Sequence, residues 1–461
     1  MKMQTQGLRF RGKPCSVQHP SVFASAARLG RLSLLMSLAL ISAPPLTGQK
    51  MSKIDRDLAK SMLENVSSDV RDHYFDQRLG GLDWTKLVAD AEENIASAPN
   101  MAFANAQIEG LLERLHDSHT FLILPRNGNV VDYGWQFQII GKRAYITQVD
   151  PGSDAEKQGM RPGDELLTVN GFALERATIE KLKDAMYVYV PGAHVEADLR
   201  DQTGKVAHLR IATKVARRQI VFGTPQWNFT HFINNMENEW NQKRAKYKEL
   251  SPDVAVLRIP MFVEMGDDVD GIFKKIDSHK TLIVDLRGTP GGELTSVESF
   301  LAHVFDRDIA VGQALQRGKT KPIAVKGRRH GSFEGDLIVL IDSESSSGAE
   351  IFARAVQIEQ RGTILGDQSA GLVREARFFW HEFGMDPVIH YASEVAIADT
   401  IMADGKSLEG VGVQPDRMFL PTPADLAAGR DPVLAHAASL AGVTLSPEEA
   451  AKLLPRPKPE E

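Results

Sequence analysis

A serine-rich turn lies between a strand-like and a helix-like stretch, and its residue types could carry out nucleophilic chemistry. Residues 337–341 are all Leu, Ile or Val, which predicts a buried parallel strand. A helical spacing of apolar residues begins near Glu350, and three serines, Ser345 to Ser347, stand between the two stretches. Active sites of α/β sheets gather at such junctions, where a strand ends and the positive end of a helix dipole begins. The turn is therefore a candidate site for a serine nucleophile.

The same turn also has a purely structural interpretation. Ser347 and Glu350 form the pattern Ser-x-x-Glu, which is typical of a capping box with the serine as N-cap and the glutamate at the third helical position. The two interpretations are compatible, because a serine whose backbone begins a helix can still direct its hydroxyl outward. Both therefore stay open on these residues alone.

A glycine-rich loop follows another strand-like stretch. The sequence DLRGTPGGE, residues 285–293, contains Gly288, Gly291 and Gly292, which permit tight turns and expose backbone N–H groups. Such a loop could bind an anion or a developing oxyanion. It lacks the Gly-Lys-Ser/Thr of a phosphate-binding loop, so no nucleotide cofactor is expected.

A serine nucleophile needs a base within hydrogen-bond reach, a group that orients the base, and N–H donors for the oxyanion. Among thirteen histidines, His119 is the best placed, because it lies between a helical pattern and a short strand-like run. A structural role for this histidine stays open. His116 and His119 are spaced i, i+3, but no third ligand lies near them in the sequence, so no metal site is expected.

Composition limits the kind of protein that this chain can be. Its 461 residues suffice for two or three domains, and 43% of them are apolar, which supports packed cores. Residues 1–50 contain seven Lys or Arg and no acidic residue, so the remainder has 47 basic against 60 acidic residues, a net charge of −13. This balance argues against nucleic acid as a partner.

The basic start resembles a secretion signal. Arg28 and Arg31 precede the apolar run 32–43, which is short for a membrane span and suits a signal-peptide core. We expect a signal peptide over residues 1–48, cleaved at Ala43 or shortly beyond it, and export to the periplasm or the medium. An uncleaved membrane anchor and a start codon placed too far upstream stay open. The single cysteine would be removed, which excludes cysteine catalysis and disulfides.

The remaining chain divides by its patterns. We expect a helical domain over 49–127 that carries the histidine, and a separate module over 128–214. Residues 215–440 alternate strand-like and helix-like stretches, which predicts a βαβ core with a largely parallel sheet. Residues 441–461 end in LLPRPKPEE and are expected to be a flexible tail.

The module over 128–214 resembles a PDZ domain, most specifically in the run GMRPGDELLTVNG. The resemblance implies that a peptide adds as a strand beside a binding loop, and that its terminal carboxylate meets backbone N–H groups. The facing helix would be ATIEKLKDAM. A degenerate PDZ that acts as a spacer or lid stays open. The residues of the matching loop are Gly134, Trp135, Gln136 and Phe137.

An ordered set of motifs over about residues 55–440 resembles the serine peptidase family of the carboxyl-terminal-processing (tail-specific) proteases and the tricorn core protease. No single motif decides the resemblance, but their order is very specific. It implies a multidomain α/β fold with a core of ClpP/crotonase-like type. Around the PDZ module, the motifs are LHDSHT, LRIPMF, LIVDLRGTPGG, IDSESSSGAEIFARAVQ, GTILGDQSAG and LEGVGVQPD.

The resemblance implies a nucleophile three residues before the helix glutamate, which is Ser347. In the tail-specific branch a lysine follows in a Phe-Gly-Lys pattern, but the matching position in SAGLV is Leu372, so a serine–lysine dyad is not expected. The tricorn-like branch instead uses a histidine in a Ser-His pattern and a late glutamate. The matching residues are Ser118, His119 and Glu409.

The roles follow from serine-protease chemistry. His119 would be the base, and Glu409 would orient it directly or through the hydroxyl of Ser118. The oxyanion would meet the N–H of Gly348 and one from Gly291 or Gly292.

The sequence therefore predicts an exported serine endopeptidase with polypeptide substrates. The PDZ groove is expected to hold these substrates by their carboxyl ends. No cofactor is expected, and homo-oligomerisation stays open. The alternative is an inactive peptide-binding protein of the same fold, which the missing lysine favours. Small-ligand binding is a third hypothesis, for which the sequence offers no positive sign.

Overall fold

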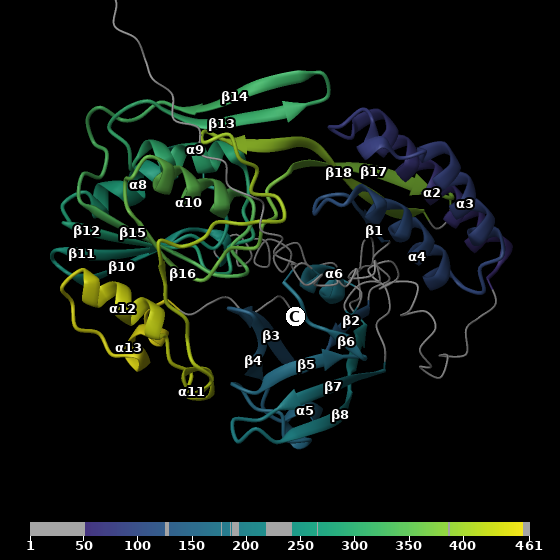
Figure 1. Cartoon of the computed structure of the whole chain (residues 1–461), viewed down its shortest axis with the longest axis horizontal. Helices are drawn as coiled ribbons and strands as arrows, with labels where there is room; N and C mark the ends of the chain where they lie inside the picture. Colours follow the sequence, from purple (N-terminus) through teal and green to yellow (C-terminus); the bar gives the residue numbers. More distant parts are fainter. Residues whose placement is uncertain are drawn as a thin grey trace, which may run out of the picture.

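The computed structural model shows a multidomain α/β protein with three parts (Figure 1). These are an N-terminal group of helices, a small β-rich module and a larger α/β core. The expected signal peptide lies outside the residues that the structure describes. The described residues are 51–124, 129–176, 178–184, 186, 193–217, 242–264, 266–385 and 388–454.

A six-stranded sheet forms the centre of the core. Its strands β11, β12, β15, β16 and β19 run parallel, and only β10 is antiparallel. The largely parallel sheet predicted for residues 215–440 is thus confirmed. The side chains of β11, β12, β15 and β16 are almost entirely buried, because helices cover both faces of the sheet. In spatial order the strands are β10 (Lys246–Ser251), β11 (Val254–Arg258), β12 (Thr281–Asp285), β15 (Asp336–Ile341), β16 (Thr363–Gly366) and β19 (Arg417–Met418).

Two layers of helices enclose this sheet (Figure 1). Helices α8 (Gly266–Ile276), α9 (Leu294–Ala302) and α10 (Gly348–Ile358) share one hydrophobic cluster with one face of the sheet. Helices α12 (Pro432–Leu440) and α13 (Pro447–Leu453) pack on the other face. The ends of β12 and β15 therefore lie side by side at one edge of the core, next to the beginning of α10.

The prediction of a flexible tail from residue 441 onward is wrong for residues 441–454. Helix α13 begins with a capping box between Ser446 and Glu449, with Pro447 at its first position. It buries Ala450 in the same cluster as α12. Burial of this apolar face holds the segment on the core, whereas the Pro-rich composition that suggested a tail applies to residues outside the described part.

A second sheet joins the core to the N-terminal helices. Helices α2 (Lys53–His73), α3 (Trp84–Ala96) and α4 (Met101–Leu112) share their hydrophobic cluster with Tyr391, Val395 and Ala396 of β18. The helical domain expected over 49–127 thus has no separate core, because its apolar faces are completed by a strand from late in the chain. The strands of this sheet are β1 (Phe121–Ile123), β13 (Ile309–Gln316), β14 (Lys319–Val325), β17 (Glu375–Phe383) and β18 (Ile389–Met402).

The β-rich module has a core of its own. Strands β2 (Asn129–Asp132) and β9 (Lys214–Arg217) pair with each other where the chain enters and leaves it, close to the limits of the expected module. Strand β3 is at the edge of its sheet. The elements are β3 (Trp135–Ile140), β4 (Arg143–Val149), α5 (Asp154–Lys157), β5 (Glu165–Val169), β6 (Phe172–Ala173), α6 (Ile179–Asp184), β7 (His194–Arg200) and β8 (Val206–Ala212).

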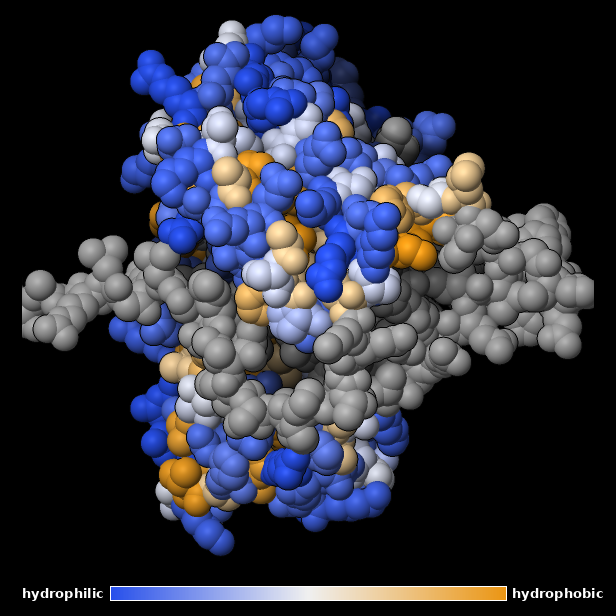
Figure 2. All heavy atoms as spheres, turned by 90° about the vertical axis from the view of Figure 1, so that its right-hand side faces the viewer, coloured by the Kyte–Doolittle hydropathy of each residue, from blue (hydrophilic) through white to orange (hydrophobic). Residues whose placement is uncertain are grey.

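The side of the molecule that carries α2 and α3 faces the viewer in Figure 2. Figure 2 shows this side as largely hydrophilic, with apolar side chains exposed in small groups. None of the described helices is both long and apolar enough to span a bilayer.

Candidate active site

The three serines after β15 have different surroundings. Ser345 is fully buried, and its hydroxyl donates to Leu286 O at 2.8 Å and accepts from the N–H of Asp342 at 2.9 Å. The N–H of Ser346 donates to Thr289 O at 2.9 Å, so this residue ties the turn to the glycine-rich loop. These bonds engage the hydroxyl of Ser345 and the backbone of Ser346.

Ser347 has a strained backbone at the start of α10. Its φ of 52° and ψ of −116° lie outside the usual regions for a residue with a side chain. Its N–H donates to Leu372 O at 2.7 Å and to the carboxylate of Glu350 at 3.1 Å. The N-cap position expected for Ser347 and the third helical position of Glu350 are thus confirmed. The half-buried hydroxyl stays available for other chemistry.

Glu350 is a buried organiser of this turn, a role that the sequence interpretation as a cap partner missed. Besides Ser347, its carboxylate accepts from the hydroxyl of Ser369 at 2.6 Å and from the N–H groups of Gly371 and Leu372, both at 2.8 Å. Burial raises the pKa of Glu350 to about 7, and the four donors oppose this rise. The glutamate therefore fixes the 369–372 segment against the beginning of α10. A charged residue among the apolar residues of the first turn of the helix was the available signal.

The glycine-rich loop backs directly onto Ser347. Gly291 has a φ of 99°, and a Cβ there would come within 2.6 Å of Ser347 Cβ and 2.9 Å of Gly348 N. A Cβ on Gly292 would meet the carbonyl oxygen of Phe262 at 2.3 Å. Within the described ranges, the N–H groups of Gly291, Gly292 and Gly348 donate no backbone hydrogen bond. This arrangement is suited to an oxyanion, and Gly291 lies directly beside the serine.

His119 is held by its own short segment. Its N–H donates to Asp117 Oδ1 at 2.8 Å, and its ring Nδ1 lies 2.6 Å from the hydroxyl of Ser118. Burial lowers the pKa of His119, while the negative charges of Glu409 and Asp117 act in the opposite direction. A neutral imidazole with Nδ1 engaged leaves Nε2 as the nitrogen that could accept a proton.

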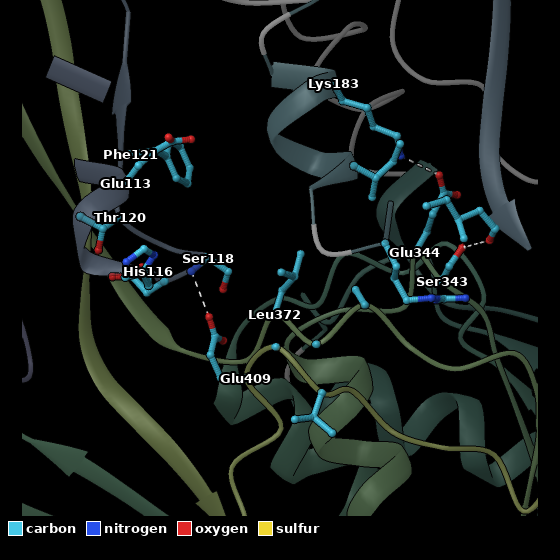
Figure 3. Close-up of a pocket in the computed structure, with 18 of the residues that line it drawn as sticks. Glu113, His116, Ser118, Thr120, Phe121, Lys183, Ser343, Glu344, Leu372 and Glu409 are labelled. Carbon is cyan, nitrogen blue, oxygen red and sulfur yellow. Dashed lines mark hydrogen bonds and ion pairs between the residues drawn. The ribbon is translucent and has the colours of Figure 1, made fainter. Parts of the chain in front are cut away.

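Glu409 joins the histidine segment to the core. One carboxylate oxygen accepts the N–H of Ser118 at 3.0 Å, and the other accepts the N–H of Val373 at 3.0 Å. Figure 3 shows the first of these contacts. Over the described part of the chain, neither oxygen is hydrogen-bonded to the imidazole. Glu409 thus contacts the backbone of Ser118, next to His119 in the chain.

A single segment, residues 369–374, brings these groups together. Leu372 O holds the N–H of Ser347, Val373 N is held by Glu409, and Arg374 lies 3.5 Å from Asp117. Leu372, which replaces the lysine of the tail-specific branch, is thus adjacent to the serine in space. The structure places the Ser347 turn and the His119 segment on opposite ends of this short connection. No hydrogen bond joins Ser347 to His119 among the described contacts.

A cavity of about 430 Å³ opens beside this connection. Its walls come from all three parts of the molecule (Figure 3). The N-terminal part contributes His116, Asp117, Ser118, Thr120 and Phe121. The β-rich module contributes Ile139, Ile179 and Lys183, and the core contributes loops that include Leu372 and Glu409.

The loop expected to bind peptides is placed as follows. The side chains of Trp135 and Phe137 are buried in the core of the module, with ring centroids 5.4 Å apart. Gly134 packs against Ser153, and Gln136 is half-buried. Backbone groups and the side chain of Gln136 are therefore the parts of this loop that could meet a ligand.

The module is clamped to the core beside the cavity. Arg176 donates to Gln368 O at 2.7 Å and to Asp367 at 2.9 Å, and Lys183 pairs with Glu344 at 3.1 Å. Ser343 donates to Ile139 O on the edge strand β3. The loop that precedes Ser347 thus already occupies part of the edge that a peptide would use.

Metal ligands do not cluster in the described residues. No group of three or more His, Cys, Asp or Glu side chains there could hold a metal ion. Acid–base and nucleophilic chemistry are what the described side chains offer.

The fold and this site define an α/β protein of the serine-peptidase type with a β-rich binding module. Residues 253–418 match the family model of peptidase family S41, and residues 127–187 match that of the PDZ domain. The core of the chain is thus similar to peptidase family S41 and the module before it to the PDZ domain, which confirms the resemblance found in the sequence.

Two relatives illustrate the match. The chain is 23% identical to the tail-specific protease of Haemophilus influenzae over 426 residues, which cover 85% of this chain and 58% of the relative. It is 22% identical to the carboxy-terminal processing protease CtpB of Bacillus subtilis over 355 residues, covering 76% of this chain and 66% of CtpB. The chain thus spans less than two thirds of the length of these relatives.

Solved structures share the fold. Mature CPAF superposes with a TM-score of 0.60 at 14% identity, covering 81% of this chain and 94% of CPAF. A complex of mature CPAF with lactacystin gives a TM-score of 0.58 at 14% identity, with 82% and 96% covered.

Proposed function

We propose that this protein is an exported serine endopeptidase that cleaves polypeptides. The observation that carries the proposal is the 369–374 segment, which ties the Ser347 turn and the Ser118–His119–Glu409 group to one short stretch of backbone. A hydroxyl, an imidazole and free N–H groups are the parts that acyl transfer needs.

The steps follow from this placement. Ser347 Oγ attacks the scissile carbonyl carbon while His119 Nε2 takes its proton. The N–H groups of Gly348 and Gly291 bind the oxyanion, at about 3–4 kcal/mol for one such donor in other serine proteases. The C–N bond then breaks as His119 returns the proton to the leaving amine. Water, activated by the same imidazole, releases the acyl group from Ser347 and restores the enzyme.

Glu409 and Ser118 are positioning residues in this mechanism. In the tautomer that this mechanism uses, His119 Nδ1–H donates to the hydroxyl of Ser118, and Nε2 is free to accept a proton. The carboxylate of Glu409 holds the backbone of Ser118 and keeps a negative charge near the imidazolium that forms.

The first prediction tests Ser347. Cleavage of an unfolded, reduced and alkylated protein by wild type should be abolished by Ser347→Ala, with the far-UV spectrum unchanged, because the attacking hydroxyl is removed. Ser346→Ala, the neighbour bound only through its backbone, should retain most of the activity. Undiminished turnover by Ser347→Ala would refute the assignment.

The second candidate function is peptide binding without catalysis. It is favoured by Leu372 in place of the lysine and by the absence of a Ser347–His119 hydrogen bond among the described contacts. A fluorophosphonate probe discriminates the two functions. Labelling of Ser347 in wild type, and not in His119→Ala, supports the peptidase, whereas no labelling of folded wild type supports the binding protein.

The proposal includes export and recognition of peptide ends by the PDZ module. The basic, apolar sequence of residues 1–48 supports export, and N-terminal sequencing of the protein from the periplasm or the medium tests it. Backbone groups at Gly134 to Phe137 support capture of a terminal carboxylate. A substrate peptide with an amidated carboxyl end should therefore show a higher KM than the free acid.

A further inference from the structure

Glu394 is a buried carboxylate with no partner among the described residues. It is 9% exposed, and it makes no hydrogen bond or ion pair there. Other buried carboxylates are engaged: Asp69 accepts from His381 and Ser393, and Asp285 pairs with arginines. A buried, unpaired carboxylate is costly, so its presence calls for a physical reason.

The strand register places Glu394 on the cavity side of the second sheet. On β18 it lies between Phe121 of β1 and Phe378 of β17, which are its direct cross-strand neighbours. Directly paired residues share one face of a sheet. Phe121 lines the cavity, and its ring points into it in Figure 3.

The adjacent residue supports this orientation. Ser393 donates its hydroxyl to Asp69 on α2, so it faces the helices. Because successive side chains of a strand alternate between faces, Glu394 faces away from the helices. Its side chain therefore lies between Phe121 and Phe378 on the face turned away from the helices, and we call this three-residue arrangement the slot.

The slot is suited to a cation. Burial, together with the charge of Asp117, raises the pKa of Glu394 to about 7. An incoming positive charge would offset the cost of ionising the buried carboxylate, because it stabilises the charged form. The flanking rings suit a long aliphatic stem with a cationic end. Phe378 is 52% exposed and Trp380, whose ring centroid is 6.4 Å from that of Phe378, is 71% exposed, so the approach is open.

We propose that Glu394, Phe121 and Phe378 form a subsite that binds a lysine or arginine side chain of the substrate. This inference rests on the proposed peptidase function and names its substrate class. Phe121 follows His119 by two residues, and an extended chain advances about 3.3–3.6 Å per residue. The basic residue would therefore lie within about three positions of the scissile bond.

The test compares peptide pairs. Internally quenched peptides carry lysine or norleucine at each of three positions on either side of the scissile bond, so stem length is matched and charge differs. Wild type should show a kcat/KM about tenfold higher for lysine than for norleucine at one position. In Glu394→Gln this ratio should fall to about one. Glu382→Gln, an exposed carboxylate on the same hairpin, should keep the wild-type ratio.

Two outcomes overturn the subsite. One is a wild-type ratio near one at every position, and the other is a ratio that Glu394→Gln leaves unchanged. If wild type cleaves no peptide, the peptidase proposal fails separately. Fluorescence anisotropy of the same peptides on Ser347→Ala then decides the subsite, since equal binding of lysine and norleucine peptides would exclude it.

Discussion

His119 and its neighbours decide the chemistry at the scale of single residues. Burial dominates over the two nearby carboxylates, so the pKa of this imidazole lies below its ordinary value of 6.5. A base with a lowered pKa is neutral, and therefore ready to accept a proton, over the whole neutral range.

The pH profile should reflect this shift. We expect kcat/KM to rise with pH through a midpoint below 6.5 and then to level off, as the imidazolium loses its proton. Glu409→Gln removes a charge that favours the imidazolium, so its midpoint should lie lower still. A midpoint above 6.5 in wild type would contradict the burial argument. The measurement is kcat/KM for one peptide from pH 4.5 to 8.5.

Segment 369–374 and helix α10 act together at the scale of elements. Glu350 accepts four hydrogen bonds that hold this segment against the first turn of the helix. Ser347 is itself one of the donors, and Leu372, another donor, also accepts the N–H of Ser347, so the geometry of the serine depends on this carboxylate.

Replacing this carboxylate should disturb the site more than the fold. In Glu350→Gln the amide would present N–H groups to N–H donors, and at least one bond is lost. We expect unfolding free energy to fall by about 1–3 kcal/mol, and kcat to fall on the order of 10²-fold because Ser347 shifts. Urea unfolding and peptide kinetics measure the two effects. Glu375→Gln, exposed just beyond the segment, is the control, and an equal kcat in both variants would refute the role.

Packing of late segments onto early ones shapes the whole molecule. Strand β18 completes the core of the N-terminal helices, and α12 and α13 cover the second face of the central sheet. Arg287 fastens this C-terminal layer: its guanidinium donates to Asp431, the N-cap of α12, at 2.8 and 2.7 Å and also binds Asp285.

Loss of this arginine should loosen the whole protein. Arg287→Ala leaves the largely buried Asp431 without its counter-charge and Asp285 with Arg258 alone, so we expect unfolding free energy to fall by about 3–5 kcal/mol. Arg430→Ala, which removes a partly exposed arginine from the same region, should cost far less. Thermal and urea unfolding report the difference. Similar losses of unfolding free energy in the two variants would show that the buried Arg287–Asp431 pair does not hold the C-terminal helices on the core.

Much of the core fold and of the candidate site could be predicted from the sequence because the relevant signals are local. Apolar runs identified the parallel strands, the Ser-x-x-Glu pattern identified the beginning of α10, and an ordered set of motifs identified the family. The same kind of signal was present for α13, whose capping box between Ser446 and Glu449 was overlooked in favour of Pro-rich composition. Local patterns suffice here because strand periodicity and helix caps depend on residues only a few positions apart.

Tertiary structure alone decided which distant groups meet. The hydrogen bond from the N–H of Ser118 to Glu409 joins residues 291 positions apart in the chain. The hydrogen bond from the N–H of Leu372 to Glu350 joins residues 22 positions apart. The slot at Glu394 exists only because β1 and β17 pair on either side of β18. Such contacts are set by how sheets and helices bury their apolar faces against one another, and no short stretch of sequence contains that information.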